Sequence, residues 1–193
     1  MGATLGHAVL SPTLAPVTLT RVTDSTPRRL VVMRHARAEH SGPSDHERRL
    51  TDGGADDARA AGAWLAGLGL EPDHVLVSAA LRTRETWEAV AEGAGWDDDA
   101  THDEGLYAAG PETALDLVRQ SPADALTVVV VGHNPTMATL AQLLDDGEGD
   151  EEASNDLAGG FPTCAAAVLE VDDDWADLEE QSARLLAFHV SRA

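Results

Sequence analysis

Residues 126–135 read Leu-Thr-Val-Val-Val-Val-Gly-His-Asn-Pro. A short run of apolar, mostly β-branched residues such as 126–131 is typical of a strand that is buried on both faces of a parallel sheet. The run stops at Gly132, and polar residues follow at once. Ligands of open parallel sheets bind beyond the carboxyl ends of the strands, so His133 is a candidate site residue.

Similar but shorter apolar runs, at 30–33 and 75–77, predict two more buried strands. Between these runs lie segments with apolar residues three and four positions apart, which predict helices. The predicted helices are 51–65, with Thr51 as its N-cap, 81–91, ended by Gly93 and Gly95, 111–118, and 136–144. Two late strands are predicted at 165–171 and 183–190, with an acidic turn between them, and the acidic, glycine-rich segment 145–160 is predicted to be a mobile loop.

Strands that alternate with helices predict an α/β fold, a three-layer sandwich with a mainly parallel central sheet. The last two strands can pair as a hairpin, so we expect an antiparallel edge. Residues 1–27 are rich in Thr, Pro, Ala and Ser without a clear period, which predicts a disordered N-terminal arm. Residues 28–193 are then expected to form a single domain.

The composition narrows the classes of function. A single cysteine among 193 residues excludes an internal disulfide, and the formal net charge of −21 argues against nucleic acid and anionic membranes as partners. The apolar runs are of strand length, and the first 20 residues lack the usual layout of a signal peptide. We therefore expect a cytoplasmic protein.

Three predicted strand ends carry side chains that suit a phosphoryl group. Arg34 and His35 end the first strand, Arg82 lies one turn after the second, and His133 follows the third. Arginine binds phosphate oxygens through a planar fork of donors and stays charged. A neutral histidine can attack phosphorus, and a second, protonated histidine can stabilise the transition state. The set as a whole therefore predicts a phosphoryl-transfer site.

Five segments resemble, in order, the motifs of the histidine phosphatase superfamily, and Ala36 makes the first of them similar to the SixA-type branch of phosphohistidine phosphatases. They are Val-Val-Met-Arg-His-Ala (31–36), Arg-Arg-Leu-Thr-Asp-Gly-Gly (48–54), Ser-Ala-Ala-Leu-Arg-Thr-Arg-Glu-Thr (78–86), Gly-His-Asn-Pro (132–135) and Phe-Pro-Thr-Cys-Ala (161–165). The sequence departs from the branch pattern where Arg49 and Ala79 replace proline and Glu85 replaces glutamine. The resemblance covers about residues 30–190.

This resemblance implies a role for each matching residue. His35 would be the nucleophile, and Arg34, Arg82 and His133 would bind the phosphoryl group. Arg48 would be a further cation on the substrate side. The family fold is an α/β sandwich, and neither a metal nor another cofactor is needed. Five of the 13 arginines lie in or beside the predicted site segments, so a locally positive pocket is expected on an acidic protein; they are Arg34, Arg37, Arg48, Arg49 and Arg82.

Larger members of the superfamily protonate the leaving group with a carboxylate after the second helix, and Glu104 lies in roughly that region. The implied substrate is a phosphohistidine-bearing protein or a small phosphorylated compound. Two other interpretations of the function remain open. One is a phosphate-binding module without turnover, and the other is a metal-dependent hydrolase that uses His35, His133 and nearby carboxylates. Taken singly, these residues also fit structural roles, such as an ion pair of Arg82 with Glu85 or Glu88.

Overall fold

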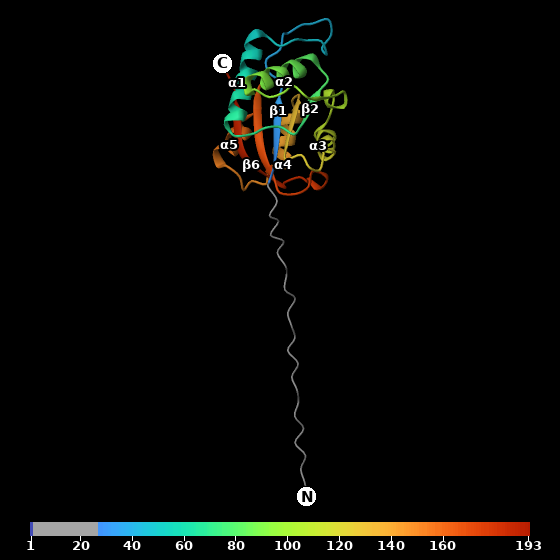
Figure 1. Cartoon of the computed structure of the whole chain (residues 1–193), viewed down its shortest axis with the longest axis vertical. Coiled ribbons are helices and arrows are strands. Elements are labelled where there is room, and N and C mark those ends of the chain that lie inside the picture. Colours follow the sequence, from blue (N-terminus) through green and yellow to red (C-terminus); the bar gives the residue numbers. More distant parts are fainter. Residues whose placement is uncertain (2–26) are drawn as a thin grey trace.

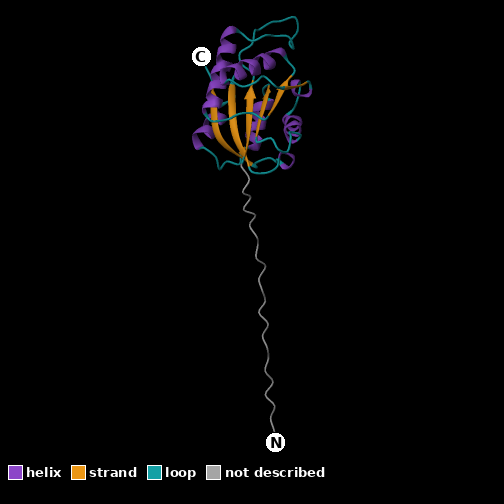
Figure 2. Cartoon of the chain, in the orientation of Figure 1, coloured by secondary structure: helices purple, strands orange, loops and turns teal. Residues whose placement is uncertain are grey.

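The computed structural model describes residue 1 and residues 27–193, in which one six-stranded sheet lies between two layers of helices (Figures 1 and 2). The strands are β1 (Arg28–Arg34), β2 (His74–Ser78), β3 (Thr101–Asp103), β4 (Thr127–Gly132), β5 (Ala165–Val171) and β6 (Ala183–Val190). The helices are α1 (Asp52–Gly67), α2 (Leu81–Ala94), α3 (Pro111–Arg119), α4 (Thr136–Leu144) and α5 (Glu151–Gly159), with 3₁₀ turns at Gly105–Tyr107 and Trp175–Asp177. Within residues 27–193, no helix has the length and apolar character needed to cross a membrane.

The strand order in the sheet is β3-β2-β4-β1-β5-β6. The first four of these strands pair in parallel, whereas β5 is antiparallel to β1 and β6 is antiparallel to β5. This arrangement confirms the predicted mainly parallel α/β sandwich and the antiparallel edge formed by the last two strands.

The alternation of side chains along the central strands divides the core into two layers. Val129 and Val131 of β4 pack with α1 and α2, and Val128 and Val130 pack with α3, α4 and α5 on the other face. All four valines are buried, as expected for a central parallel strand covered on both faces.

Helices α1 and α2 pack closely because glycines stand at their crossing. A Cβ atom on Gly62 would lie 2.0 Å from the carbonyl oxygen of Val90, and one on Gly93 would lie 2.1 Å from that of Arg59. Gly93 therefore lies inside α2 and does not end it, contrary to the prediction. The helix ends at Ala94, and Gly95 follows in the left-handed conformation with φ of 75°.

The prediction of a mobile loop at 145–160 is wrong, because Glu151–Gly159 form helix α5. The side chain of Asp150 caps this helix by accepting a hydrogen bond from the Ala153 amide at 2.8 Å. Only Ala153 and Leu157 of the helix are buried, so its apolar period is too weak to recognise in an acidic sequence. The predicted arm of residues 1–27 lies, apart from residues 1 and 27, outside the described residues.

Asp57 connects the segment that follows β1 to the last residue of the chain. Its buried carboxylate accepts hydrogen bonds from Arg37 Nε at 2.8 Å and from the Ala193 amide at 3.0 Å. Figure 1 accordingly places the C-terminus beside α1. Because Arg37 is two residues after His35, this carboxylate fixes the chain as it leaves β1.

We expect Asp57→Ala to lower the free energy of unfolding by about 1–3 kcal/mol, because it removes a buried acceptor from two donors. Urea denaturation monitored by circular dichroism would measure the loss. Asp56→Ala is the matched control, since the adjacent Asp56 is exposed and pairs only with Arg59 on its own helix among the described residues. Equal losses in the two variants would contradict the assignment.

Candidate active site

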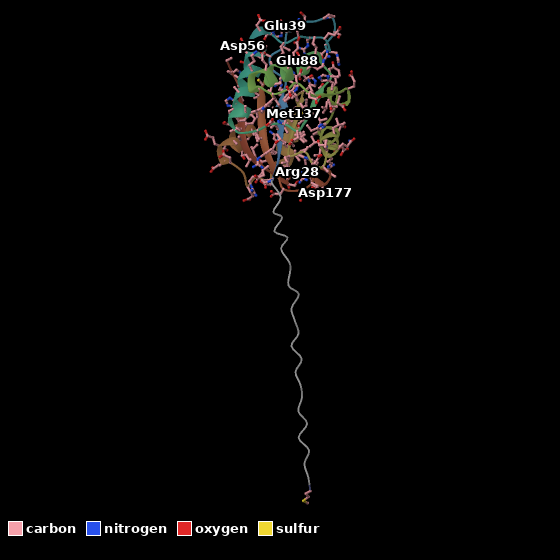
Figure 3. The ribbon with its side chains drawn as sticks, viewed as in Figure 1. Arg28, Glu39, Asp56, Glu88, Met137 and Asp177 are labelled. Atoms are coloured by element: carbon pink, nitrogen blue, oxygen red, sulfur yellow. The ribbon has the colours of Figure 1, made fainter. Side chains whose placement is uncertain are left out.

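The candidate site forms where β1 and β4 end side by side. Arg34 pairs with Gly132 in the parallel register, and the His35 amide donates to the Gly132 carbonyl at 3.0 Å. The rings of His35 and His133 consequently lie 5.3 Å apart between centroids. Figure 3 labels Arg28, at the start of β1, and Glu39, in the loop after it, at opposite ends of the folded part of the chain, and His35 follows the end of β1 that leads to Glu39. The structure thus brings the two predicted histidines together.

His35 is held in one tautomer. Its Nδ1 lies 2.7 Å from the carbonyl oxygen of Ala36, and because a carbonyl can only accept, Nδ1 carries the proton. The Nε2 lone pair is therefore free to attack. Burial lowers the pKa of His35 to about 4, and the charges of Arg82, Arg34 and Arg48 also lower it. The ring is neutral at physiological pH, as a nucleophile must be.

His133 is also neutral, and this differs from the expected protonated second histidine. Arg82 Nη2 lies 3.3 Å from its Nδ1, and a guanidinium can only donate, so the proton is on Nε2. That Nε2 donates to Ser78 Oγ at 2.8 Å. Burial, followed by the charge of Arg82, lowers the pKa of His133 to about 3. Sequence motifs locate this histidine but do not reveal how deeply it is buried.

The predicted arginines supply the positive charge around the two neutral rings. Arg34 Nη1 donates to the Phe161 carbonyl at 3.0 Å, an oxygen that also accepts from the Asn134 side chain at 2.7 Å. Arg82, from the first turn of α2, is buried. The Nε–H groups of both Arg34 and Arg82 are buried and have no acceptor among the described residues. Buried donors without partners are costly, and a bound oxyanion would satisfy them.

Asp45 and Tyr107 complete the site, and the sequence analysis did not single them out. The Asp45 carboxylate accepts from Arg82 Nη2 at 3.2 Å, Arg48 Nε at 2.9 Å and the Tyr107 hydroxyl at 2.7 Å. The hydrogen bond from Tyr107 is the largest cause that lowers the pKa of Asp45 to about 2, and the two arginines add to it. The Tyr107 ring lies edge-on to His133, with 5.7 Å between ring centroids. In the sequence, only their positions point to the site, since Asp45 lies close to Arg48 and Tyr107 lies close to Glu104.

Glu104, the predicted general acid, lies at the margin of this arrangement. Its side chain is 80% exposed, and its Oε2 lies 3.6 Å from Nε2 of His46. The His46 ring in turn contacts the Tyr107 ring, with centroids 4.9 Å apart. Within residues 27–193, Glu104 makes no hydrogen bond or ion pair with His35 or His133. His46 thus lies between Glu104 and Tyr107.

Two of the five arginines expected in the positive pocket form ion pairs with carboxylates outside the site. Arg37 bonds Asp57, and Arg49 Nε donates to Glu85 at 2.7 Å. Arg49 and Glu85 are both departures from the branch pattern, and they contact each other. Arg34, Arg48 and Arg82 remain as the cations that lower the pKa of His35. In the part of the chain that the structure describes, no group of three or more His, Cys, Asp and Glu side chains is placed to hold a metal ion.

Comparisons with known proteins identify the family of this chain. A model of the histidine phosphatase superfamily (branch 1) matches residues 30–107. An uncharacterized protein of Mycobacterium tuberculosis is 38% identical over 83% of this chain and 100% of its own length, and the phosphohistidine phosphatase SixA of Escherichia coli is 31% identical over 61% of this chain and 74% of its own.

Solved structures show the same likeness. A candidate phosphohistidine phosphatase SixA from Nakamurella multipartitia is 36% identical, with a TM-score of 0.77 over 88% of this chain and 99% of its own. A protein histidine phosphatase SixA complexed with tungstate is 26% identical, with a TM-score of 0.64 over 84% and 96% of the two chains. The fold is thus that of the phosphoglycerate mutase-like proteins, and the chain belongs to branch 1 of the histidine phosphatase superfamily.

Proposed function

We propose that this protein is a metal-independent phosphatase that forms a phosphohistidine on His35 and acts on protein phosphohistidine or a small phosphorylated compound. One observation carries the proposal: the neutral His35 ring, with its proton held on Nδ1, stands among arginines whose buried Nε–H groups have no acceptor in residues 27–193. A nucleophile and an unfilled oxyanion site are what phosphoryl transfer requires.

The reaction follows from these groups in two steps. His35 Nε2 attacks phosphorus, the bond to the leaving nitrogen or oxygen breaks, and the leaving atom takes the electron pair. Water then attacks the phosphorus of the phosphohistidine, which releases phosphate and restores the His35 lone pair. Arg34, Arg48 and Arg82 offset the negative charge on the phosphoryl oxygens, and His133, which accepts from Arg82 and donates to Ser78, positions Arg82 beside the His35 ring.

The relatives support this proposal. SixA of Escherichia coli carries the name phosphohistidine phosphatase, and a related SixA structure contains tungstate, a tetrahedral oxyanion like phosphate. The two alternatives make different demands. A phosphate-binding module needs the arginines but forms no covalent bond, and a metal-dependent hydrolase loses activity when its ion is removed.

His35→Ala should abolish both turnover and covalent labelling. Incubation with a labelled phosphoryl donor, followed by quenching, should trap label that is acid-labile and base-stable on the wild-type protein only. His102→Ala, which changes an exposed histidine in β3, is the control and should label normally. Normal turnover in His35→Ala would contradict the mechanism, and binding of phosphate without any label would favour the non-enzymatic module.

The His35 ring should stay neutral throughout the neutral pH range. Because its pKa is lowered to about 4, the nucleophile is fully available above pH 5 and is lost only as the pH falls through about 4. Nuclear magnetic resonance titration of the ring, assigned with His35→Ala, would measure the midpoint directly. In urea the same ring should return to about 6.5. A folded-state midpoint between 6 and 7 would argue against a buried, desolvated nucleophile.

Glu104→Gln tests the leaving-group acid and the substrate class together. An alkyl phosphate releases a basic alkoxide, which needs a proton, whereas a phosphohistidine that is protonated on its ring releases neutral imidazole and needs little help. If Glu104 is the acid, the variant should lose roughly 10²–10⁴ in rate on an alkyl phosphate and almost nothing on a phosphohistidine peptide. Glu112→Gln, in α3, is the matched control. Equal losses in kcat/KM on both substrates would exclude this assignment.

A further inference from the structure

The guanidinium of Arg82 uses its two edges for different contacts. Along the outer edge, Nη1 donates to the Asp45 backbone carbonyl at 2.7 Å and Nη2 donates to the Asp45 carboxylate at 3.2 Å. Along the side edge, Nη2 faces His133 Nδ1 at 3.3 Å and the neighbouring Nε–H is buried without an acceptor in the described chain. A guanidinium is planar and rigid, so fixing one edge fixes the direction of the other.

Asp45 reaches Arg82 from a loop and is itself held there. Its carboxylate also binds Arg48 Nε and the Tyr107 hydroxyl, and the Arg82 carbon Cζ lies 5.9 Å from the centre of the Tyr107 ring. Asp45 is 57% exposed at its side chain, but Arg82 is only 6% exposed. The carboxylate therefore stays on the solvent side of the guanidinium, and the buried Nε–H of Arg82 lies on the inner side.

A competing role for Asp45, as an internal anion that occupies the phosphoryl position, fits these contacts less well. An internal anion at that position would accept from the buried donors of the site, yet Nε of Arg82 and Nε of Arg34 both lack an acceptor among the described residues. Asp45 binds the outer edge, and Nη2 also donates to His133 Nδ1, so Nε–H remains as the buried donor of Arg82 without an acceptor among the described residues.

Resting on the phosphatase function proposed above, we propose that Asp45 is a positioning residue, which turns the unfilled Nε–H of Arg82 toward the phosphoryl group on His35 and anchors Arg48 at the same site. Asp45 touches neither the substrate nor the reacting atoms in this scheme. It acts through the direction of the two guanidinium groups, and Tyr107 holds the carboxylate in place.

The test compares Asp45→Ala, which removes the carboxylate, with Asp45→Asn, which keeps one acceptor oxygen. Asp45→Ala should weaken vanadate binding and lower kcat/KM by roughly 10- to 100-fold, as expected for losing charge-assisted contacts, and Asp45→Asn should recover part of both. Glu47→Gln is the control from the same loop, where Glu47 accepts from Ser44 and makes no contact with an arginine among the described residues. Thermal unfolding should show that all three variants fold.

Combining Asp45→Ala with Arg82→Lys gives the sharper result. If Asp45 acts through the arginines, its loss should cost far less once Arg82 is lysine, because the directed edge is already gone. Losses that multiply fully would overturn the proposal. Tighter vanadate binding in Asp45→Ala would also overturn it, and would show that Asp45 is an internal anion at the phosphoryl position.

A crystal structure of Asp45→Ala is independent of activity. The Arg82 guanidinium should leave the side of His133, and an unchanged position would overturn the proposal. The two proposals also fail differently. A wild-type protein that binds no vanadate and turns over no phosphoryl substrate contradicts the function, whereas an active wild type matched by an equally active Asp45→Ala contradicts only the role of Asp45.

Discussion

The parallel pairing of β1 with β4 is the constraint on which the site depends. Both strands are apolar on both faces and lie at the centre of the sheet, so their register is set by burial in two layers of core. A slip of one residue would exchange the two faces of β4 and bury the wrong valines. The same register aligns Arg34 with Gly132 and thereby places His35 next to His133. Hydrophobic packing thus determines the spacing of the two imidazoles.

Among the described residues, the positive charge of the site comes from arginine. Burial keeps His35 and His133 neutral, with pKa values of about 4 and about 3, so neither ring adds a positive charge near neutral pH. Guanidinium groups do not deprotonate in proteins, and three of them surround the rings. A chain with a formal net charge of −21 therefore keeps a cluster of cations whose charge does not change over the neutral range.

Elements with a continuous buried face could be predicted from the sequence. Contacts between individual side chains could not. Apolar runs predicted the strands from β1 to β6 except β3, whose residues Thr101–Asp103 are largely exposed and carry no apolar pattern. Motifs brought His35, His133 and Arg82 into one site, because strand ends converge in a parallel sheet. Asp45 was missed because it lies in an irregular loop, where no periodicity shows which carboxylate will meet an arginine from α2. Glu104 was chosen by its place in the sequence, which does not determine the direction of an exposed side chain.

The contact between Arg49 and Glu85 joins the segment before α1 to helix α2, and both residues are departures from the pattern of the SixA-type branch. One Glu85 oxygen accepts from the Leu50 amide at 2.7 Å, a bond that the usual glutamine could also accept. Among the described residues, the other oxygen has no such backbone donor and accepts from Arg49, which stands where the branch pattern has proline. Proline has no side-chain donor, so a carboxylate opposite it would lack this partner. The two positions should therefore change together during evolution, and Arg with Glu would mark this lineage apart from relatives with Pro and Gln.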